Sequence, residues 1–170
     1  MIEMNKEKIL QQYSLLSEYY DLLADKRKYQ REVELIAKIL SKYKVRKILD
    51  IGCGTGTHSI LFAKKGFQVS GIDISQAMIT HAKVNAEREG VKVNFFVEDM
   101  RNFNLREKFD ACLYLHSFYY LTENSDIERA LNSLIRHLKF NGIVVIFHYS
   151  VFNSVLSGSF QKTYLIKTAC

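Results

Sequence analysis

A short apolar run followed by an acidic residue and three alternating glycines is the most constraining feature of this sequence. It reads ILDIGCGTGTHS and occupies residues 48–59. The apolar run is typical of a buried strand, and Gly52, Gly54 and Gly56 let the backbone turn sharply and approach a ligand closely. A helix predicted to begin near Thr57 directs free N–H groups at the loop, which favours a negative or oxygen-rich group. We therefore expect a strand–loop–helix unit that binds a nucleotide-like ligand, although a plain strand-to-helix turn is an alternative.

The rest of the chain alternates between helical periodicity and short apolar runs. Strands are expected at residues 46–51, 67–73, 91–99, 109–115 and 142–149, and helices at residues 5–24, 26–42, 57–66, 75–89 (with Ser75 as its cap) and 125–138. Strands that are apolar on both faces and separated by helices predict an α/β fold with a parallel sheet wound on both sides. We expect one domain over residues 1–170, with N-terminal helices to 42, a core sheet over 46–148 and a short tail over 149–170.

Composition excludes several classes of protein. The chain has 170 residues, 48% of them hydrophobic, and no apolar run of about 18 residues that predicts a membrane span. The charged N-terminus lacks the features of a secretory signal, so the expected compartment is the cytoplasm. Three distant cysteines, Cys53, Cys112 and Cys170, argue against a disulfide framework and a zinc site, and we expect no metal.

The chain carries a net charge of +6, with 24 Lys and Arg against 18 Asp and Glu. Basic and acidic residues are interleaved along the whole chain, which favours solvated helix faces over a nucleic-acid surface. We therefore do not expect nucleic acid as a partner.

Two further acidic residues narrow the class of ligand that this site could bind. Asp73 ends the second expected strand, where a carboxylate can accept the two hydroxyls of an unphosphorylated ribose. Asp99 follows the third strand and could accept from the exocyclic amine of adenine while the N–H of Met100 donates to a ring nitrogen. The alternative for Asp99 is a cap of the loop over 99–108. The three features together indicate an adenosine-containing ligand.

Four segments together carry a family resemblance: ILDIGCGTG, GIDIS, EDMRNF and FDACLYLHSFYYL. They resemble the class I S-adenosylmethionine-dependent methyltransferases over about residues 9–148, and most of all the small-molecule group that includes amino-sugar N,N-dimethyltransferases. The resemblance implies a Rossmann-like sheet of strand order 3-2-1-4-5 with an N-terminal helical cap. It also implies S-adenosylmethionine as cofactor and S-adenosylhomocysteine as product.

The resemblance also implies roles for single residues. Asp50 and the backbone of the glycine loop would hold the methionine end, Ile74 would pack on adenine, and Leu115 would line the sulfonium. Tyr13 and Tyr20 would close the site from the N-terminal helix, unless they are core residues of that helix. The full set implied for the cofactor is Tyr13, Tyr20, Asp50, Gly52, Cys53, Gly54, Gly56, Asp73, Ile74, Met78, Asp99, Met100 and Leu115.

Two histidines are candidates for catalysis. His116 and His148 end the fourth and fifth expected strands, on the side of the sheet where ligands bind. Either could take a proton from an amine or hydroxyl acceptor, and either could be only a polar residue satisfied at a strand end. A base is not obligatory, because methyl transfer from a sulfonium depends mainly on alignment.

The C-terminal part departs from the family pattern. Residues 150–170 are too few for the two antiparallel strands and the helix with which the family sheet usually ends. That hairpin is therefore expected to be missing or reduced, and the edge of the fifth strand to be covered by the tail or by a second copy of the chain in a homodimer.

Three functions remain. The leading one is methyl transfer to nitrogen or oxygen of a small molecule, and the second is a non-catalytic module that binds S-adenosylmethionine. An RNA methyltransferase is suggested only by charge and is the weakest of the three.

Overall fold

The computed structural model describes residues 26–149 and 161–167. The helix expected over 5–24, with Tyr13 and Tyr20, lies outside the described residues.

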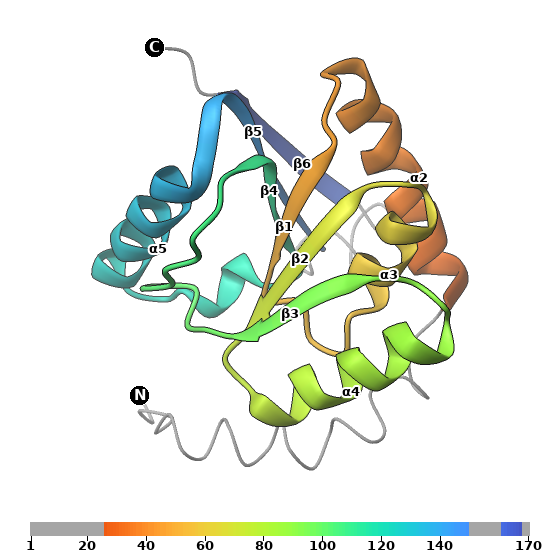
Figure 1. The fold of residues 1–170 in the computed structure, drawn as a ribbon. Helices are drawn as coiled ribbons and strands as arrows, with labels where there is room; N and C mark the ends of the chain where they lie inside the picture. The colour runs from red at the N-terminus through yellow and green to blue at the C-terminus, as the bar shows by residue number, and fades with distance from the viewer. Residues whose placement is uncertain (1–25, 150–160, 168–170) are drawn as a thin grey trace, which may run out of the picture.

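The described residues form one six-stranded sheet in the order β3-β2-β1-β4-β5-β6 (Figure 1). Its strands are β1 (Lys47–Ile51), β2 (Gln68–Asp73), β3 (Val93–Val97), β4 (Phe109–Leu115), β5 (Leu138–Tyr149) and β6 (Gln161–Lys167). The first five strands run parallel, which confirms the expected order 3-2-1-4-5. The order reverses between β1 and β4, and in such sheets ligands bind at this switch point.

Helices cover both faces of the sheet. They are α2 (Lys26–Lys42), α3 (Thr57–Lys64), α4 (Gln76–Arg88), α5 (Asn124–His137) and the single 3-10 turn η1 (Phe118–Tyr120). Figure 1 shows α2, α3 and α4 on one side of the sheet and α5 on the other. Within the described ranges, no helix is both long enough and apolar enough to cross a membrane.

The strands β1, β2 and β4 are buried on both faces because helices cover each face of the sheet there. Along β4, Ala111 and Leu113 belong to the cluster that packs with α2 and α3. Their neighbours Cys112 and Tyr114 belong to the cluster that packs with Leu134 of α5. Successive side chains of this strand therefore point to opposite faces and pack into two different hydrophobic cores, as expected for a doubly wound sheet.

Local signals set the helix ends. Ser75 caps α4, because its hydroxyl accepts the backbone N–H of Met78 at 3.3 Å. Gly66 follows α3 with φ of +89°, a conformation that glycine adopts at low cost. Both ends were expected from the sequence.

One boundary differs from the expectation. Strand β5 begins at Leu138, directly after α5, rather than at Gly142. Asn141 has φ of +58°, and the pairing of β4 with β5 changes register between Phe109 and Ala111. The Asn-Gly bend is therefore an irregularity inside a longer strand rather than a loop before it.

A tail strand occupies the edge of β5. Strand β6 pairs with it antiparallel, from Ile143 opposite Lys167 to Tyr149 opposite Gln161. This agrees with the expectation that the tail covers this edge. Because β6 occupies this edge, pairing of β5 with a second copy of the chain would require β6 to be displaced, and the homodimer stays a prediction.

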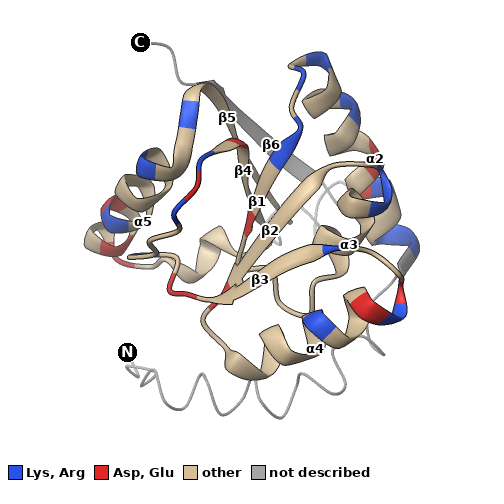
Figure 2. Ribbon diagram, in the orientation of Figure 1, with Lys and Arg blue, Asp and Glu red and all other residues tan. Residues whose placement is uncertain are grey.

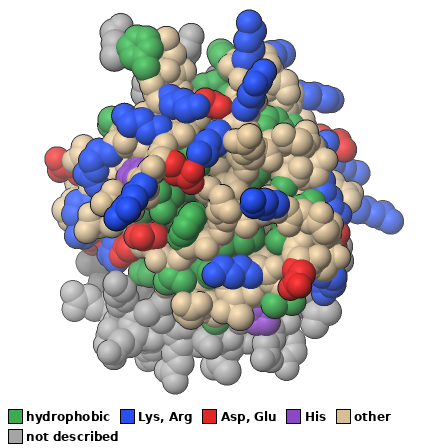
Figure 3. Space-filling view, in the orientation of Figure 1, with side chains coloured by type: hydrophobic (Ala, Val, Ile, Leu, Met, Phe, Trp, Pro, Cys, Tyr) green, Lys and Arg blue, Asp and Glu red, His purple; other side chains and the backbone are tan. Residues whose placement is uncertain are grey.

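Charged residues are spread over the described surface. Figure 2 shows Lys and Arg on α2, α5 and several loops, with Asp and Glu between them. The face drawn in Figure 3 shows the same mixture, without a continuous basic stripe among its described residues. The arrangement matches the interleaved charges of the sequence.

Candidate active site

The glycine loop follows β1 at the carboxyl end of the sheet. The N–H groups of Gly52 and Cys53 both donate to the carbonyl of Ile72, at 2.8 and 2.9 Å, which ties the loop to β2. Gly52, Gly54 and Gly56 have φ of +76°, +54° and +82°. L-residues with a side chain rarely adopt these angles, so the loop has this path because it contains glycine.

Two of these glycines have different surroundings. A Cβ atom built on Gly52 would lie 2.5 Å from Cβ of Ser117, whereas one built on Gly54 would meet no heavy atom of the described residues within 4 Å. Ser117 in turn donates its hydroxyl to the carbonyl of Ile51 at 2.5 Å. Gly52 therefore allows close packing within the protein, and Gly54 borders space that the described residues leave open to a ligand.

Asp50 lies beneath this loop and is almost fully buried. Its Oδ2 accepts the hydroxyl of Ser59 at 2.6 Å, and its side chain is on the α3 face of the sheet. Burial raises the pKa of Asp50, and the nearby charge of His58 opposes that rise. A buried carboxylate whose side-chain hydrogen bond, among the described residues, comes from a neutral hydroxyl is well suited to meet a cationic group.

Asp73 ends β2 and is held by backbone groups. Gly54 donates its N–H to Oδ2 and Ser75 donates its N–H to Oδ1, both at 2.9 Å. Burial raises the pKa of Asp73, and these N–H donors counteract the increase. A carboxylate offers about four acceptor positions, so this one has capacity for further hydroxyl donors.

Asp99 is engaged by Arg101, a partner that sequence reasoning missed. The backbone N–H of Arg101 donates to Oδ1 of Asp99, and its guanidinium donates to both carboxylate oxygens. Arg101 also donates to Asp126 of α5 at 3.0 Å, and these two carboxylates raise its pKa. The loop-cap alternative is thus present in the structure, and a role in reading adenine remains a prediction.

Other expected residues lie around the loop. The Cε atom of Met100 lies 3.6 Å from the position that a Cβ atom on Gly52 would occupy. The Sγ atom of Cys53 lies 3.0 Å from the position that a Cβ atom on Gly71 would occupy. Leu115 and Met78 are buried, and Ile74 is half-buried. Burial also raises the pKa of the Cys53 thiol, which fits a small packing residue rather than a nucleophile.

His116 follows β4 with a left-handed backbone. Its φ is +60°, and its N–H donates to the carbonyl of Phe147 at 2.8 Å. Its Nε2 lies 3.0 Å from Oε2 of Glu32, and Nε2 of His58 lies 2.9 Å from the same oxygen. His148 pairs through its backbone with Lys162 of β6, and its side chain is outside the described part.

Glu32 was not expected from the sequence. It is 1% exposed and comes from α2, on the face that also buries Val33 and Ile36. Burial alone would raise the pKa of Glu32, but hydrogen bonds and charges of His116 and His58 lower it to about 2. An acidic residue four positions before Ile36 on an apolar helix face was the available signal.

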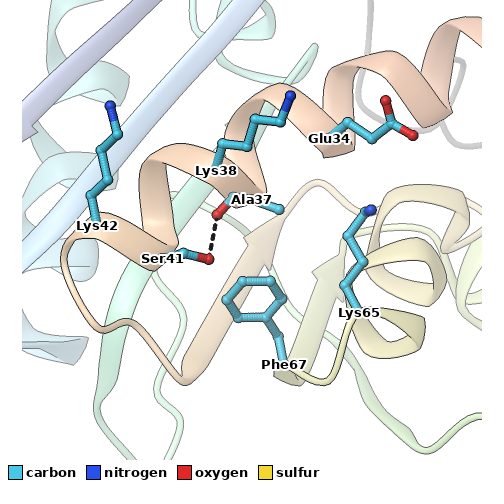
Figure 4. Close-up of a pocket in the computed structure, with 7 residues that line it drawn as sticks. All are labelled: Glu34, Ala37, Lys38, Ser41, Lys42, Lys65 and Phe67. Atoms are coloured by element: carbon cyan, nitrogen blue, oxygen red, sulfur yellow. Dashed lines mark hydrogen bonds between the residues drawn. The ribbon is translucent and has the colours of Figure 1, made fainter.

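A surface cavity lies elsewhere in the molecule. It has a volume of about 530 Å³ and lies between α2 and the turn from α3 to β2 (Figure 4). Its lining residues are Glu34, Ala37, Lys38, Ser41, Lys42, Lys65 and Phe67. They lie toward the amino ends of β1 and β2, and none belongs to the predicted site, so this cavity is not the candidate active site.

Comparisons with known proteins agree with this geometry. A model of a methyltransferase domain matches residues 48–142. The dTDP-3-amino-3,4,6-trideoxy-alpha-D-glucopyranose N,N-dimethyltransferase of Streptomyces venezuelae is 31% identical over 135 residues, covering 76% of this chain and 55% of the relative. A glycine/sarcosine N-methyltransferase of Aphanothece halophytica is 32% identical over 118 residues, covering 68% of this chain and 44% of the relative.

A solved structure shows the same fold. The S-adenosylmethionine-bound amino pentose methyltransferase CalS10 from Micromonospora echinaspora superposes with a TM-score of 0.66 at 26% identity, covering 75% of this chain and 55% of that chain. The chain spans about half the length of the curated relatives it matches. Because the domain model matches more than half of the chain and the fold and glycine loop agree with it, the chain belongs to the methyltransferase domain family.

Proposed function

We propose that this chain binds S-adenosylmethionine at the carboxyl end of β1, β2 and β4, and that it transfers the methyl group to nitrogen or oxygen of a small molecule. The observation that carries the proposal is the open space at Gly54 beside a carboxylate, Asp73, that the same loop holds in place. Its support from relatives is the family membership and the cofactor named for CalS10.

The residues present fit this cofactor. The missing side chain of Gly54 leaves room for close approach, and Asp73 has acceptor capacity for two ribose hydroxyls. The buried Asp50 would balance the positive charge of the methionine end. Met100 and Ile74 would border adenine, and Asp99 would share its carboxylate between Arg101 and the exocyclic amine.

When bound, the cofactor supplies a methyl group that is already activated by the sulfonium. The protein then has to align the acceptor and exclude water, which in well-oriented reactions contributes about 7–11 kcal/mol. Leu115, at the end of β4, would border the reacting centre. The polypeptide needs no strong base for an amine acceptor that arrives unprotonated.

Two tyrosines provide an aromatic surface for the acceptor. Tyr119 and Tyr120 belong to η1, which comes shortly after His116 in the chain, and they are 57% and 52% exposed. Their ring centroids lie 4.3 Å apart, and their hydroxyl groups are joined by a hydrogen bond of 3.0 Å. Exposed rings with polar tips can pack on an amine-bearing ring while the hydroxyls contact its substituents.

Calorimetry with S-adenosylmethionine and with S-adenosylhomocysteine tests the cofactor part. We expect both to bind, and we expect Asp73→Asn to weaken binding about 5- to 150-fold, as for loss of a hydrogen bond to a charged group worth about 1–3 kcal/mol. Asp110→Asn is the matched control, because it removes one carboxylate at the opposite end of the sheet. Equal affinity in the Asp73 variant and wild type would contradict the proposal.

A transfer assay tests the reaction. Release of S-adenosylhomocysteine is measured with panels of amines, aminosugars and phenols, and with a structured RNA. Turnover with a small molecule is the expected result. Turnover with RNA alone would identify the other class of acceptor, and cofactor binding without any turnover would identify a binding module.

A further inference from the structure

We propose that Glu32, His58 and His116 form a binding site for one divalent transition-metal cation of the zinc type. The two imidazole Nε2 atoms lie 2.9 and 3.0 Å from the same carboxylate oxygen of Glu32. All three potential ligand atoms lie within 4.8 Å of one another. The cluster adjoins the proposed cofactor site, because the charges of His58 and His116 both act on Asp50, but binding of an ion there does not depend on methyl transfer.

The spacing of the donors suits such an ion. Zinc is bound at about 2.0–2.1 Å by imidazole nitrogen and carboxylate oxygen, most often with four ligands in a tetrahedron. In a tetrahedron of that size neighbouring ligand atoms are about 3.3 Å apart. The nitrogen–oxygen separations found here are a few tenths of an ångström shorter, and the two Nε2 atoms lie within 4.8 Å of each other. An ion between the three atoms therefore requires side-chain shifts of at most about 1.5 Å.

The donor types select the class of metal. Two imidazoles and one carboxylate suit zinc and its neighbours among the first-row transition metals, whereas magnesium and calcium prefer all-oxygen sites. A set of three protein ligands leaves one position for water or another small ligand. The side chains of His58 and His116 are 10% and 20% exposed, so solvent reaches the cluster.

The three ligands are held by separate elements of the fold. Glu32 comes from α2, His58 from the first turn of α3, and His116 from the bend after β4. The ring of Tyr29 packs edge-on against His58, with centroids 4.7 Å apart, and Phe147 packs against His116 at 5.3 Å. Packing of this kind fixes the two rings before an ion arrives, which lowers the entropic cost of binding.

The hydrogen-bonded cluster without a metal is the rival interpretation. In that case one carboxylate oxygen accepts from two imidazole N–H groups and serves only to join α2 to the sheet. The two interpretations predict different behaviour toward metal ions, because a purely structural cluster gains nothing from added zinc. Metal titration therefore decides between them.

The test uses the full chain without an affinity tag, first treated with a chelator and then dialysed. Calorimetric titration with zinc chloride is expected to show one ion per chain, and addition of zinc is expected to raise the thermal unfolding midpoint. Cobalt is expected to give the intense visible bands of a tetrahedral complex. Glu32→Gln and His116→Asn are each expected to weaken binding at least about tenfold.

His81→Asn is the matched control, since it removes a histidine of α4 that is not in the cluster. Its zinc affinity is expected to equal that of wild type. The proposal fails if wild type binds no zinc, if cobalt gives only the weak spectrum of an octahedral complex, or if the Glu32 and His116 variants bind as wild type does. The cobalt spectrum of the unmodified chain decides the question even if a variant does not fold.

Discussion

Gly54 donates its backbone N–H to Oδ2 of Asp73 across 2.9 Å, so the loop after β1 and the end of β2 hold each other in place. The bond fixes the carboxylate in position within the protein itself. A ligand that donates hydrogen bonds to Asp73 therefore meets a carboxylate that is already held in place. Binding costs less side-chain entropy, which favours affinity. The same bond links the glycine that borders open space to the residue proposed to bind ribose.

Alanine substitutions at two loop glycines should separate folding from binding. Gly54→Ala is expected to cost about 1–2 kcal/mol, because a side chain is strained at φ of +54° but meets no atom of the described part of the chain within 4 Å. Gly52→Ala adds an overlap with Ser117 to a similar strain and should cost clearly more. Urea denaturation measures both costs, and calorimetry of the folded Gly54 variant should show weakened cofactor binding. Equal stability of the two variants would contradict this assignment.

Asp50→Asn should keep or increase stability while it weakens cofactor binding. Burial raises the folded-state pKa of Asp50, so its contribution to stability is greatest at low pH and is lost as pH rises from about 3.8 toward that pKa. Asparagine removes the buried charge and can still accept from Ser59. Thermal unfolding at neutral pH and calorimetry measure the two effects. A large loss of stability together with unchanged binding would show that the charge has a structural role.

Asp110→Asn should destabilise the protein at neutral pH and have less effect in acid. Burial raises the pKa of Asp110, but the hydrogen bonds of Lys139, Lys47 and Arg46 outweigh this and lower it below 3.8. The stabilising contribution is thus present above about pH 4 and is lost as pH falls through the lowered folded-state pKa. We expect a loss of about 1 kcal/mol at pH 7. Urea denaturation of both chains from pH 7 down to pH 3 should show the difference shrink.

Tyr114→Phe should stabilise the protein. Within the described part of the chain, the hydroxyl of Tyr114 is buried and has no hydrogen-bond partner. An unsatisfied buried polar group costs about 1–3 kcal/mol, and phenylalanine keeps the packing against Phe118. A gain of about 1 kcal/mol in urea denaturation is the expected result. A loss of stability would mean that the hydroxyl has a partner in the folded protein.

The order of strands and helices was predictable from the sequence because each element carries its own local signal. Period-two and helical patterns, the cap at Ser75 and the glycine after α3 all act over a few residues. The start of β5 was missed because α5 passes into it without a polar loop, and the Asn-Gly pair resembled a turn. Local patterns do not show whether such a pair joins two elements or bends one.

The candidate site was only partly predictable. The glycine loop follows β1 and Asp73 ends β2. Because these two strands are parallel neighbours, the topology alone predicts that the loop and Asp73 lie close together. The pairing of Arg101 with Asp99 depends on a side chain that reaches back two residues and also contacts α5. Glu32 lies 26 positions from His58 and 84 from His116. No spacing rule links such distant residues, and only the packing of α2 brings them together.

The shared oxygen of Glu32 has a mechanical consequence. Since both imidazoles bond to a single atom of one side chain, α2 cannot move away from one histidine while it keeps the other. Any swing of this helix would therefore release the start of α3 and the bend after β4 in the same event. Through Glu32, the position of α2 would thus couple the start of α3 to the bend after β4, the two segments on either side of the proposed binding site.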